Sequence, residues 1–227
     1  MKNVVDFDRF TKNYNVLLGE GTRFFSADDA YFAKYKIDIV RKQILCPISS
    51  MLEYGCGIGR NIPFLQCAFP TAKIVGSDVS SESLTVASEQ CPGVMFFQEK
   101  DEEEPREAVD LIFVANVFHH IPPIMRAKVM KKLFHRLKPG GHIFLFEHNP
   151  YNPVTRRLVK VCPYDKDAVL LAPSELKNHL KQAGFSNLQQ AFCLFFPPKF
   201  SRLVLLESYL SKLPLGGQYW VKAKKSD

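Results

Sequence analysis

The chain has 227 residues, of which 46% are hydrophobic and 23% are charged, as is ordinary for a globular protein. This length allows one large domain. No apolar run approaches the roughly 18 residues that a membrane-spanning helix needs, which argues against that class. The formal net charge of +7 permits acidic partners but does not require them, because the basic residues are mostly scattered.

The six cysteines form no C-x-x-C pair, and no histidine cluster has the sequence spacing of a zinc site. We therefore expect free, mostly buried thiols in a reducing compartment, and no metal. The first residues, M-K-N-V-V-D-F-D, lack the apolar core of a signal peptide. The sequence thus predicts a cytoplasmic protein.

Apolar, β-branched runs alternate with helical patterns, which favours an α/β fold with a mainly parallel sheet. About fifty residues rich in Tyr and Phe come first, and these either cover a ligand crevice or pad an edge of the core. Strands are then expected at 50–54, 73–77, 94–98, 109–115, 142–147, 187–196 and 218–223, and helices at 61–67, 81–90, 123–137, 174–183 and 199–213. Ser80 and Ser174 are the expected N-caps of the second and fourth of these helices.

Three glycines alternate directly after the first predicted strand, in M-L-E-Y-G-C-G-I-G-R from Met51 to Arg60. Because glycine has no Cβ, its backbone can turn sharply and lie against a ligand. Such a turn between a strand and a helix makes a nucleotide crevice at the carboxyl end of the strand. The spacing differs from the G-x-G-x-x-G of dinucleotide enzymes. The alternative is a tight turn that binds nothing.

The second predicted strand ends in Asp78, about 20 residues beyond the glycine turn, where a ribose-binding acid belongs. The carboxylate can accept two hydrogen bonds from vicinal hydroxyls. An acid in this position can also stabilise the start of the next helix. Together, the glycine turn and Asp78 predict a nucleoside cofactor.

Four segments resemble the motifs of class I S-adenosylmethionine-dependent methyltransferases. They are E-Y-G-C-G-I-G, S-D-V-S-S-E-S-L, D-L-I-F-V-A-N-V-F-H-H-I and L-K-P-G-G-H-I-F-L-F-E. The opening F-D-R-F-T-K-N-Y is also similar to the start of many small-molecule methyltransferases. The resemblance covers most of residues 7–147 and weakens after that.

This resemblance implies a Rossmann-like mixed sheet of seven strands, with helices on both faces and an antiparallel last strand. It implies a single methyltransferase domain over residues 1–227. Within it, residues 1–48 would form an N-terminal helical cap and 49–148 the cofactor-binding core. Residues 149–227 would supply a substrate-side insertion and the C-terminal strands.

The resemblance also implies S-adenosylmethionine as the cofactor. The backbone of Gly55, Cys56 and Gly57 would lie along its methionine part. Glu53 would support that loop, or bind the amino group through water. Arg60 either reaches the cofactor carboxylate or caps local packing.

The other cofactor residues follow the second, third and fourth strands. Asp78 would bind the ribose hydroxyls, and Val79 would flank the adenine. Glu99 or Asp101 would hold the adenine amine, and Asn116 would lie beside the methionine group or the reacting methyl.

His119 and His120 follow the fourth strand and are the catalytic candidates, since a histidine can accept a proton near neutral pH. A base is needed only if the acceptor is a hydroxyl or a protonated amine. The alternative for H-H-I-P-P is a loop in which the histidines only pack. The predicted acceptor contacts are Tyr14, His148, Asn149 and Tyr151. The alternative for N-P-Y-N-P is a turn.

The segment after the fifth strand carries two further patterns. Arg156, Arg157 and Lys160 form either a small anionic-substrate site or, as we favour, an exposed helix face. The predicted helix at 199–213 pairs an apolar face with basic residues. That face could pack on the core, cover the active site or touch a membrane surface, and we favour packing on the core.

The sequence therefore predicts a methyltransferase for a small-molecule acceptor. The net charge motivates a tRNA or rRNA methyltransferase as an alternative, although no basic stripe with interleaved aromatics supports it. A second alternative is an inactive cofactor-binding partner protein, and the glycine spacing disfavours a nicotinamide oxidoreductase. The sequence leaves the acceptor and the oligomeric state open.

Overall fold

The computed structural model describes residues 29–99 and 108–226. The first half runs α2 (Asp29–Gln43), β1 (Ser50–Tyr54), α3 (Ile62–Ala68), β2 (Lys73–Asp78), α4 (Ser81–Gln90), β3 (Met95–Gln98), β4 (Val109–Ala115) and α5 (Pro123–His135). The second half runs β5 (Leu137–His148), α6 (Pro153–Val161), η2 (Pro163–Asp165), α7 (Pro173–Ala183), β6 (Phe185–Cys193), η3 (Pro198–Leu206), α8 (Glu207–Leu210) and β7 (Gln218–Lys225).

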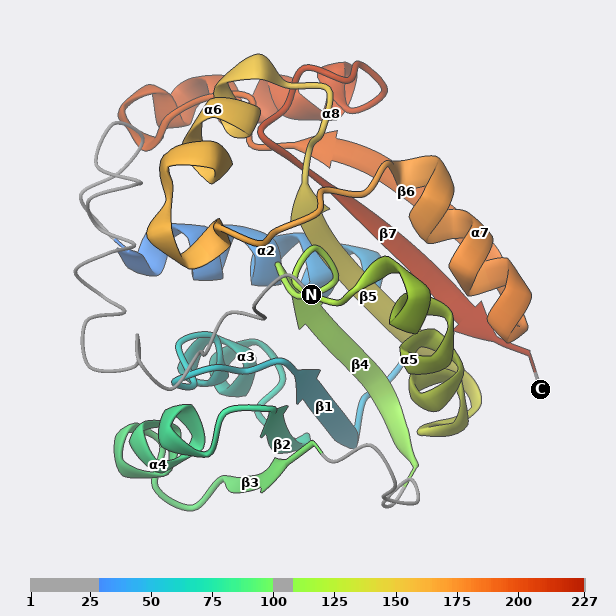
Figure 1. Ribbon diagram of the computed structural model, residues 1–227. Helices are drawn as coiled ribbons and strands as arrows, with labels where there is room; N and C mark the ends of the chain where they lie inside the picture. The colour runs from blue at the N-terminus through green and yellow to red at the C-terminus, as the bar shows by residue number, and fades with distance from the viewer. Residues whose placement is uncertain (1–28, 100–107, 227) are drawn as a thin grey trace.

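The strands form one seven-stranded sheet in the order β3-β2-β1-β4-β5-β7-β6 (Figure 1). β1 pairs in parallel with β2 and β4, and β2–β3 and β4–β5 are parallel as well. β7 is antiparallel to both of its neighbours, β5 and β6. The predicted Rossmann-like sheet with an antiparallel last strand is therefore confirmed. The predicted division at residues 48 and 148 stays a prediction, and the sheet runs across the second boundary.

Helices cover both faces of the sheet. On one face, α5 and α7 bury Met130, Leu133, Leu176 and Leu180 in a cluster with residues of β1, β4, β5 and β7. On the other face, α2 and α3 contribute Ile37, Val40, Ile62 and Leu65, and α2 passes behind the sheet in Figure 1. Phe113, Phe144 and Phe146 point to this second face from β4 and β5. β4 and β5 contain the continuous apolar runs L-I-F-V-A and I-F-L-F because both faces of the sheet are covered there.

Most predicted elements are present, with bounds that shift by a few residues. Ser80 caps α4 as predicted, since the Ser83 N–H donates to its Oγ at 3.0 Å. Ser174 is not a cap, because α7 begins at Pro173 after an N-cap at Ala172. Helix α6 was not among the bounded helix predictions, although the favoured interpretation of Arg156, Arg157 and Lys160 was an exposed helix face. Asn152 is in fact its N-cap, and Pro153 is its first residue.

The predicted helix at 199–213 is wrong in form and in packing. The chain makes 3-10 turns over η3, with a kink at Phe200, and then a single turn at α8. Leu205 and Tyr209 are more than 80% exposed, whereas Glu207 is the buried residue of α8. The broken helix scatters the apolar side chains, so no apolar face packs on the core.

The described part of the Tyr- and Phe-rich N-terminal region contains α2, which packs on one face of the sheet and contributes to the core. All six cysteines are free, and Cys56, Cys91 and Cys193 are buried, but Cys46 and Cys67 are exposed, contrary to the expectation of mostly buried thiols. Among the described residues, no helix has both the length and the apolar character needed to cross a membrane.

Candidate functional site

The glycine turn joins β1 to α3 at the carboxyl edge of the sheet. Gly55, Gly57 and Gly59 all have positive φ, at 71°, 52° and 81°. The Gly55 and Cys56 N–H groups donate to the Ser77 carbonyl at 2.7 and 2.9 Å, which ties the turn to β2. No other described atom lies within 4 Å of the position that a Cβ on Gly57 would occupy. Among residues 29–99 and 108–226, nothing therefore fills the space beside the Gly57 backbone.

Asp78 lies at the end of β2, beside this turn. Its Oδ2 accepts the Gly57 N–H at 2.8 Å, and its Oδ1 accepts the Ser80 N–H at 3.0 Å. Burial raises its pKa, and the hydrogen bonds from Ser80 and Gly57 oppose that shift. Because a carboxylate oxygen has two lone pairs, each oxygen can still accept a second hydrogen bond. Asp78 thus holds the turn and keeps capacity for a ligand.

A buried acid and a buried base, Glu53 and Lys36, lie behind the turn. Glu53 is 1% exposed, and its Oε1 accepts a hydrogen bond of 2.6 Å from Asn61 Nδ2. Its Oε2 is buried and has no hydrogen-bond partner in the part of the chain that the structure describes. Burial raises the pKa of Glu53 to about 8 and lowers that of Lys36, from α2, to about 8. Lys36 interacts electrostatically with Glu53 and Glu147, a role that no motif in its helix indicated.

The predicted adenine residues that the structure describes, Glu99 and Val79, have different surroundings. The Glu99 carboxylate is 5% exposed and is paired with Lys132 at 2.7 Å and with Arg136. These partners hold the pKa of Glu99 below its usual value, although burial alone would raise it. Val79 is 55% exposed. The role of Glu99 stays a prediction, and its carboxylate is already occupied by two cations. Asp101 lies outside the described residues.

Asn116 follows β4 with a positive φ of 59°, a conformation that Asn tolerates better than most residues. Its N–H donates to the Phe146 carbonyl at 2.8 Å, and its Oδ1 accepts from Gln218 Nε2 at 3.1 Å. The Gln218 Oε1 is buried and has no hydrogen-bond partner among the described residues. This polar pair lies at the end of β4, next to the loop that carries the two predicted catalytic histidines.

His119 is held by Glu147, a residue that the site prediction missed. Its Nδ1 lies 2.6 Å from Glu147 Oε2, while Glu147 Oε1 accepts the Val117 and Phe118 N–H groups. Both side chains are 1% exposed. Burial alone would lower the pKa of His119, but the charges of Glu147 and Asp165 raise it to about 9. A histidine with that pKa is protonated at neutral pH, which disfavours its predicted role as a base.

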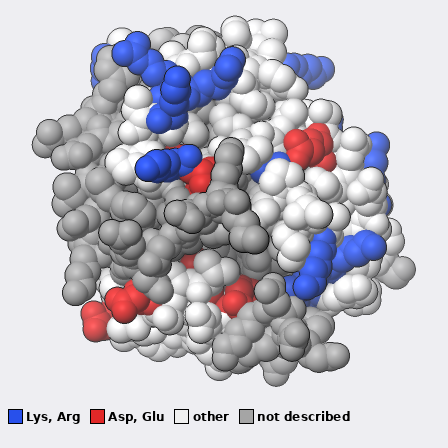
Figure 2. All heavy atoms as spheres, in the orientation of Figure 1, with Lys and Arg blue, Asp and Glu red and all other residues white. Residues whose placement is uncertain are grey.

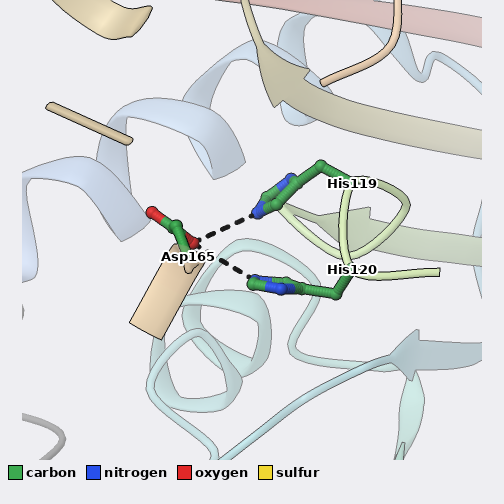
Figure 3. A group of neighbouring side chains, drawn as sticks. All are labelled: His119, His120 and Asp165. Atoms are coloured by element: carbon green, nitrogen blue, oxygen red, sulfur yellow. Dashed lines mark ion pairs between the residues drawn. The ribbon is translucent and has the colours of Figure 1, made fainter. Parts of the chain in front are cut away.

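The second missed residue is Asp165 of η2, which lies between the two histidines (Figure 3). Asp165 Oδ1 is 3.6 Å from His119 Nε2 and 3.3 Å from His120 Nε2. The Asp165 side chain is 13% exposed, and the imidazoles hold its pKa well below the usual range. Forty-five residues separate the acid from the histidines in sequence, so spacing gave no signal for this cluster.

Arg126 of α5 fixes the two loops that carry the cluster. Its guanidinium is almost fully buried and donates to the Phe118, Ile121 and Val169 carbonyls. A 2.6 Å ion pair with Glu175 holds its Nη1. One side chain therefore connects the loop after β4 with the segment after η2.

The other predicted acceptor residues are dispersed. His148 lies beside His119, with ring centroids 4.9 Å apart, and burial and the nearby His119 lower its pKa to about 4. Asn149 is buried and donates to the Pro214 and Gly216 carbonyls, which favours the turn-forming alternative. Tyr151 is 53% exposed. Tyr14 lies outside the described residues.

Arg156, Arg157 and Lys160 of α6 are all exposed, as the exposed-face interpretation expects. Figure 2 shows basic side chains along the upper rim of this face, where α6 and the η3–α8 segment lie in Figure 1. No described ion pair involves these three residues.

Comparison with known proteins agrees with the resemblance in the sequence. Residues 52–143 match the family described as "Methyltransferase domain". Trans-aconitate 2-methyltransferase from Azoarcus sp. (strain BH72) is 29% identical over 127 residues, covering 56% of this chain and 49% of that protein. Thiocyanate methyltransferase 1 from Brassica oleracea is 34% identical over 104 residues, or 43% and 45% of the two chains.

A human tRNA N(3)-cytidine methyltransferase also matches, at 29% identity over 122 residues, covering 48% of this chain and 32% of that protein. The chain spans about half the length, or less, of the curated relatives it matches.

A solved structure of a SAM-dependent methyltransferase from Thermotoga maritima, described as a possible histamine N-methyltransferase, has the same fold. It superposes with a TM-score of 0.68 at 20% identity, over 97% of this chain and 98% of that one. Residues 52–143 thus form a methyltransferase domain, and the relatives and the fold agree with the resemblance to class I S-adenosylmethionine-dependent methyltransferases.

Proposed function

We propose that the protein transfers a methyl group from S-adenosylmethionine to a small-molecule acceptor. The observation that carries the proposal is the pairing of the Gly57 backbone with the Asp78 carboxylate at the carboxyl edge of β1 and β2. This is the switch point of the sheet, because β1 has β2 on one side and β4 on the other. Open parallel sheets bind nucleosides at such points.

The residues present fit this cofactor. Asp78 retains acceptor capacity for two ribose hydroxyls, and the open space beside Gly57 admits a ligand against the backbone. The unpartnered Oε2 of Glu53 suits an ammonium group such as that of the methionine moiety. A bound amine would satisfy this buried oxygen, whose orphaned state otherwise costs about 1–3 kcal/mol.

When bound, S-adenosylmethionine supplies an electrophilic methyl group, so the protein's main task is alignment of the acceptor. Asn116 and the loop at 117–121 border the expected position of that methyl. His119, His120 and Asp165 face one another on the acceptor side, and Glu147 and Arg126 fix their loops. The depth of these side chains favours a compact acceptor over a polymer.

The curated relatives differ in what they act on, so none of them supplies the acceptor. A tRNA acceptor is the second candidate, and the exposed basic side chains of α6 and the human tRNA-modifying relative favour it. An inactive cofactor-binding protein and a cytoplasmic location both stay predictions from the sequence.

Transfer of a labelled methyl group tests the proposal. The full chain would be incubated with methyl-labelled S-adenosylmethionine and two pools, a small-molecule fraction of cell extract and total tRNA. We expect label in the small-molecule pool, and its loss with Asp78→Ala. Label in tRNA alone would overturn the small-molecule assignment. Label in neither pool, from a protein that binds S-adenosylhomocysteine, would favour the inactive alternative.

A further inference from the structure

We propose that His119, His120 and Asp165 form a binding site for a first-row divalent cation on the acceptor side of the pocket. The three residues come from two segments, the loop after β4 and the short helix η2. Their candidate ligand atoms all lie within 4.8 Å of one another (Figure 3). Two imidazoles and one carboxylate are a donor set that zinc and other first-row divalent ions accept.

The distances suit a shared ion better than two direct ion pairs. A charge-assisted N–H···O bond closes to about 2.7–2.9 Å. The two imidazole Nε2 atoms instead lie 3.3 and 3.6 Å from the same oxygen, Asp165 Oδ1. Ligand atoms on a tetrahedral zinc, at bonds of about 2.0–2.1 Å, are separated by about 3.3–3.4 Å. Small adjustments of the His120 and Asp165 side chains, which are 11% and 13% exposed, would bring all three atoms to that spacing.

Glu147 supplies the supporting contact that metal-binding histidines usually have. Its Oε2 lies 2.6 Å from His119 Nδ1 and so fixes which nitrogen carries the proton. Nε2 faces Asp165, and a metal ion bound there would displace the Nε2 proton. A carboxylate behind a ligating histidine also raises the basicity of the ligand. Asp167, 3.8 Å from His120 Nδ1, stands in the equivalent position for the second histidine.

The charges and ring contacts around His119 and His120 also favour a bound cation. The rings of His119 and His120 lie 4.2 Å apart and face three carboxylates, those of Glu147, Asp165 and Asp167. A divalent ion would join the two imidazoles and neutralise part of the carboxylate charge. Arg126, which donates to carbonyls on both segments, holds the two halves of the site together without occupying it.

Three protein ligands leave at least one coordination position for water or substrate. Resting on the proposed function, we assign that position to an oxygen of the acceptor, a hydroxyl or carboxylate. The ion would orient this oxygen toward the methyl group beside Asn116. It would also favour the deprotonated form of a hydroxyl.

Metal binding by the full chain tests the site independently of methyl transfer. The protein, freed of metal with a chelator, would be titrated with Co²⁺ by absorption spectroscopy and with Zn²⁺ by calorimetry. We expect one ion per chain. His120→Ala and Asp165→Asn should each weaken binding by about 100-fold, and Glu147→Gln by about 10- to 100-fold. The matched control is His135→Ala, which removes an exposed histidine of α5.

Each variant would first be shown to bind S-adenosylhomocysteine as the wild type does, so that misfolding is separated from loss of the metal site. Absence of binding to the wild type would overturn the proposal. Binding that His120→Ala and Asp165→Asn leave unchanged would also overturn it, because the ion would then sit elsewhere. Neither result would affect the cofactor assignment, which the same S-adenosylhomocysteine titrations measure separately.

Discussion

At the scale of single residues, two buried carboxylates of the candidate site differ in how their charge is compensated. Glu147 has backbone N–H groups on one oxygen and His119 on the other, and these partners hold its pKa below the usual value although burial opposes them. Glu53 has one oxygen without a partner, and burial raises its pKa to about 8. Glu147 is therefore charged at neutral pH, whereas a nearby cation would stabilise the charged form of Glu53.

The pH dependence of stability should reveal Glu53. Its pKa is 4.5 when unperturbed and about 8 in the fold, so the folded state binds more protons between these values. The free energy of unfolding should fall as the pH rises through this window, by up to about 1.4 kcal/mol per pH unit from this group. Glu53→Gln should remove that slope, and Glu82→Gln, on the exposed side of α4, should not.

Urea unfolding of the cofactor-free protein across this pH range measures the effect as a difference between variant and wild type. Equal slopes for wild type and Glu53→Gln would show that Glu53 does not titrate with a raised pKa.

A second test at this scale separates the energetic cost of a positive φ from the cost of a steric clash with a neighbouring side chain. Gly55 and Gly93 both have positive φ, at 71° and 85°, but a Cβ on Gly55 would lie 2.4 Å from Val117 Cγ2, and one on Gly93 would meet nothing within 4 Å. Gly55→Ala should therefore lower the free energy of unfolding by about 1–3 kcal/mol more than Gly93→Ala. Chemical denaturation measures both variants, and equal losses would mean that the Val117 contact relaxes without cost.

Some site residues can be predicted from the sequence because they act within local motifs. The three glycines and Asp78 were found in this way, through their spacing from strand ends. Glu147 and Asp165 were not, because their contacts with His119 depend on chain segments that meet only in the folded protein. Lys36 was also missed, since its helix shows only that one face is apolar.

At the scale of elements, the loop after β4 and the segment from η2 to residue 169 act as one unit. The Val169 N–H donates to the His119 carbonyl at 2.8 Å, and Arg126 bridges the same two segments from α5. The position of Asp165 relative to the two histidines therefore depends on Arg126 of α5.

Loss of Arg126 should loosen this unit. Arg126→Met would leave the Phe118, Ile121 and Val169 carbonyls without their donor, and we expect a loss of about 2–5 kcal/mol in the free energy of unfolding. Arg156→Met, on the exposed face of α6, should change it by less than about 0.5 kcal/mol. Denaturant midpoints compare the two, and equal small losses would contradict a bridging role for Arg126.

The elements themselves were predictable to different degrees. β1 and β4 agree with the sequence prediction residue for residue, because short and mainly apolar runs mark strands that are covered on both faces. The segment at 199–213 was not predictable in the same way. Its helical apolar spacing suggested one long helix, but the structure replaces it with η3 and α8. There, the buried Glu207 accepts the Phe195 and Phe196 N–H groups.

At the scale of the whole molecule, the strand order places both halves of the site on one edge. β1 and β2 bring the glycine turn to Asp78, while β4 and β5 bring Asn116 and His119 to Glu147. β7 and β6 form the edge of the sheet beyond β5, and the Gln218 side chain of β7 donates a hydrogen bond to Asn116 Oδ1. The order could be predicted only through the family resemblance, because propensity identifies strands but not their neighbours in space.

The most direct measurement is calorimetric titration of the protein with S-adenosylhomocysteine. We expect one molecule to bind per chain with a micromolar dissociation constant, and NADH not to bind. Asp78→Ala should weaken binding by about 100-fold, the loss of two hydrogen bonds to a charged group. Glu89→Ala, an exposed acid at the end of α4, should leave it unchanged. Unaltered binding by Asp78→Ala, or no binding by the wild type, would contradict the assignment of this pocket.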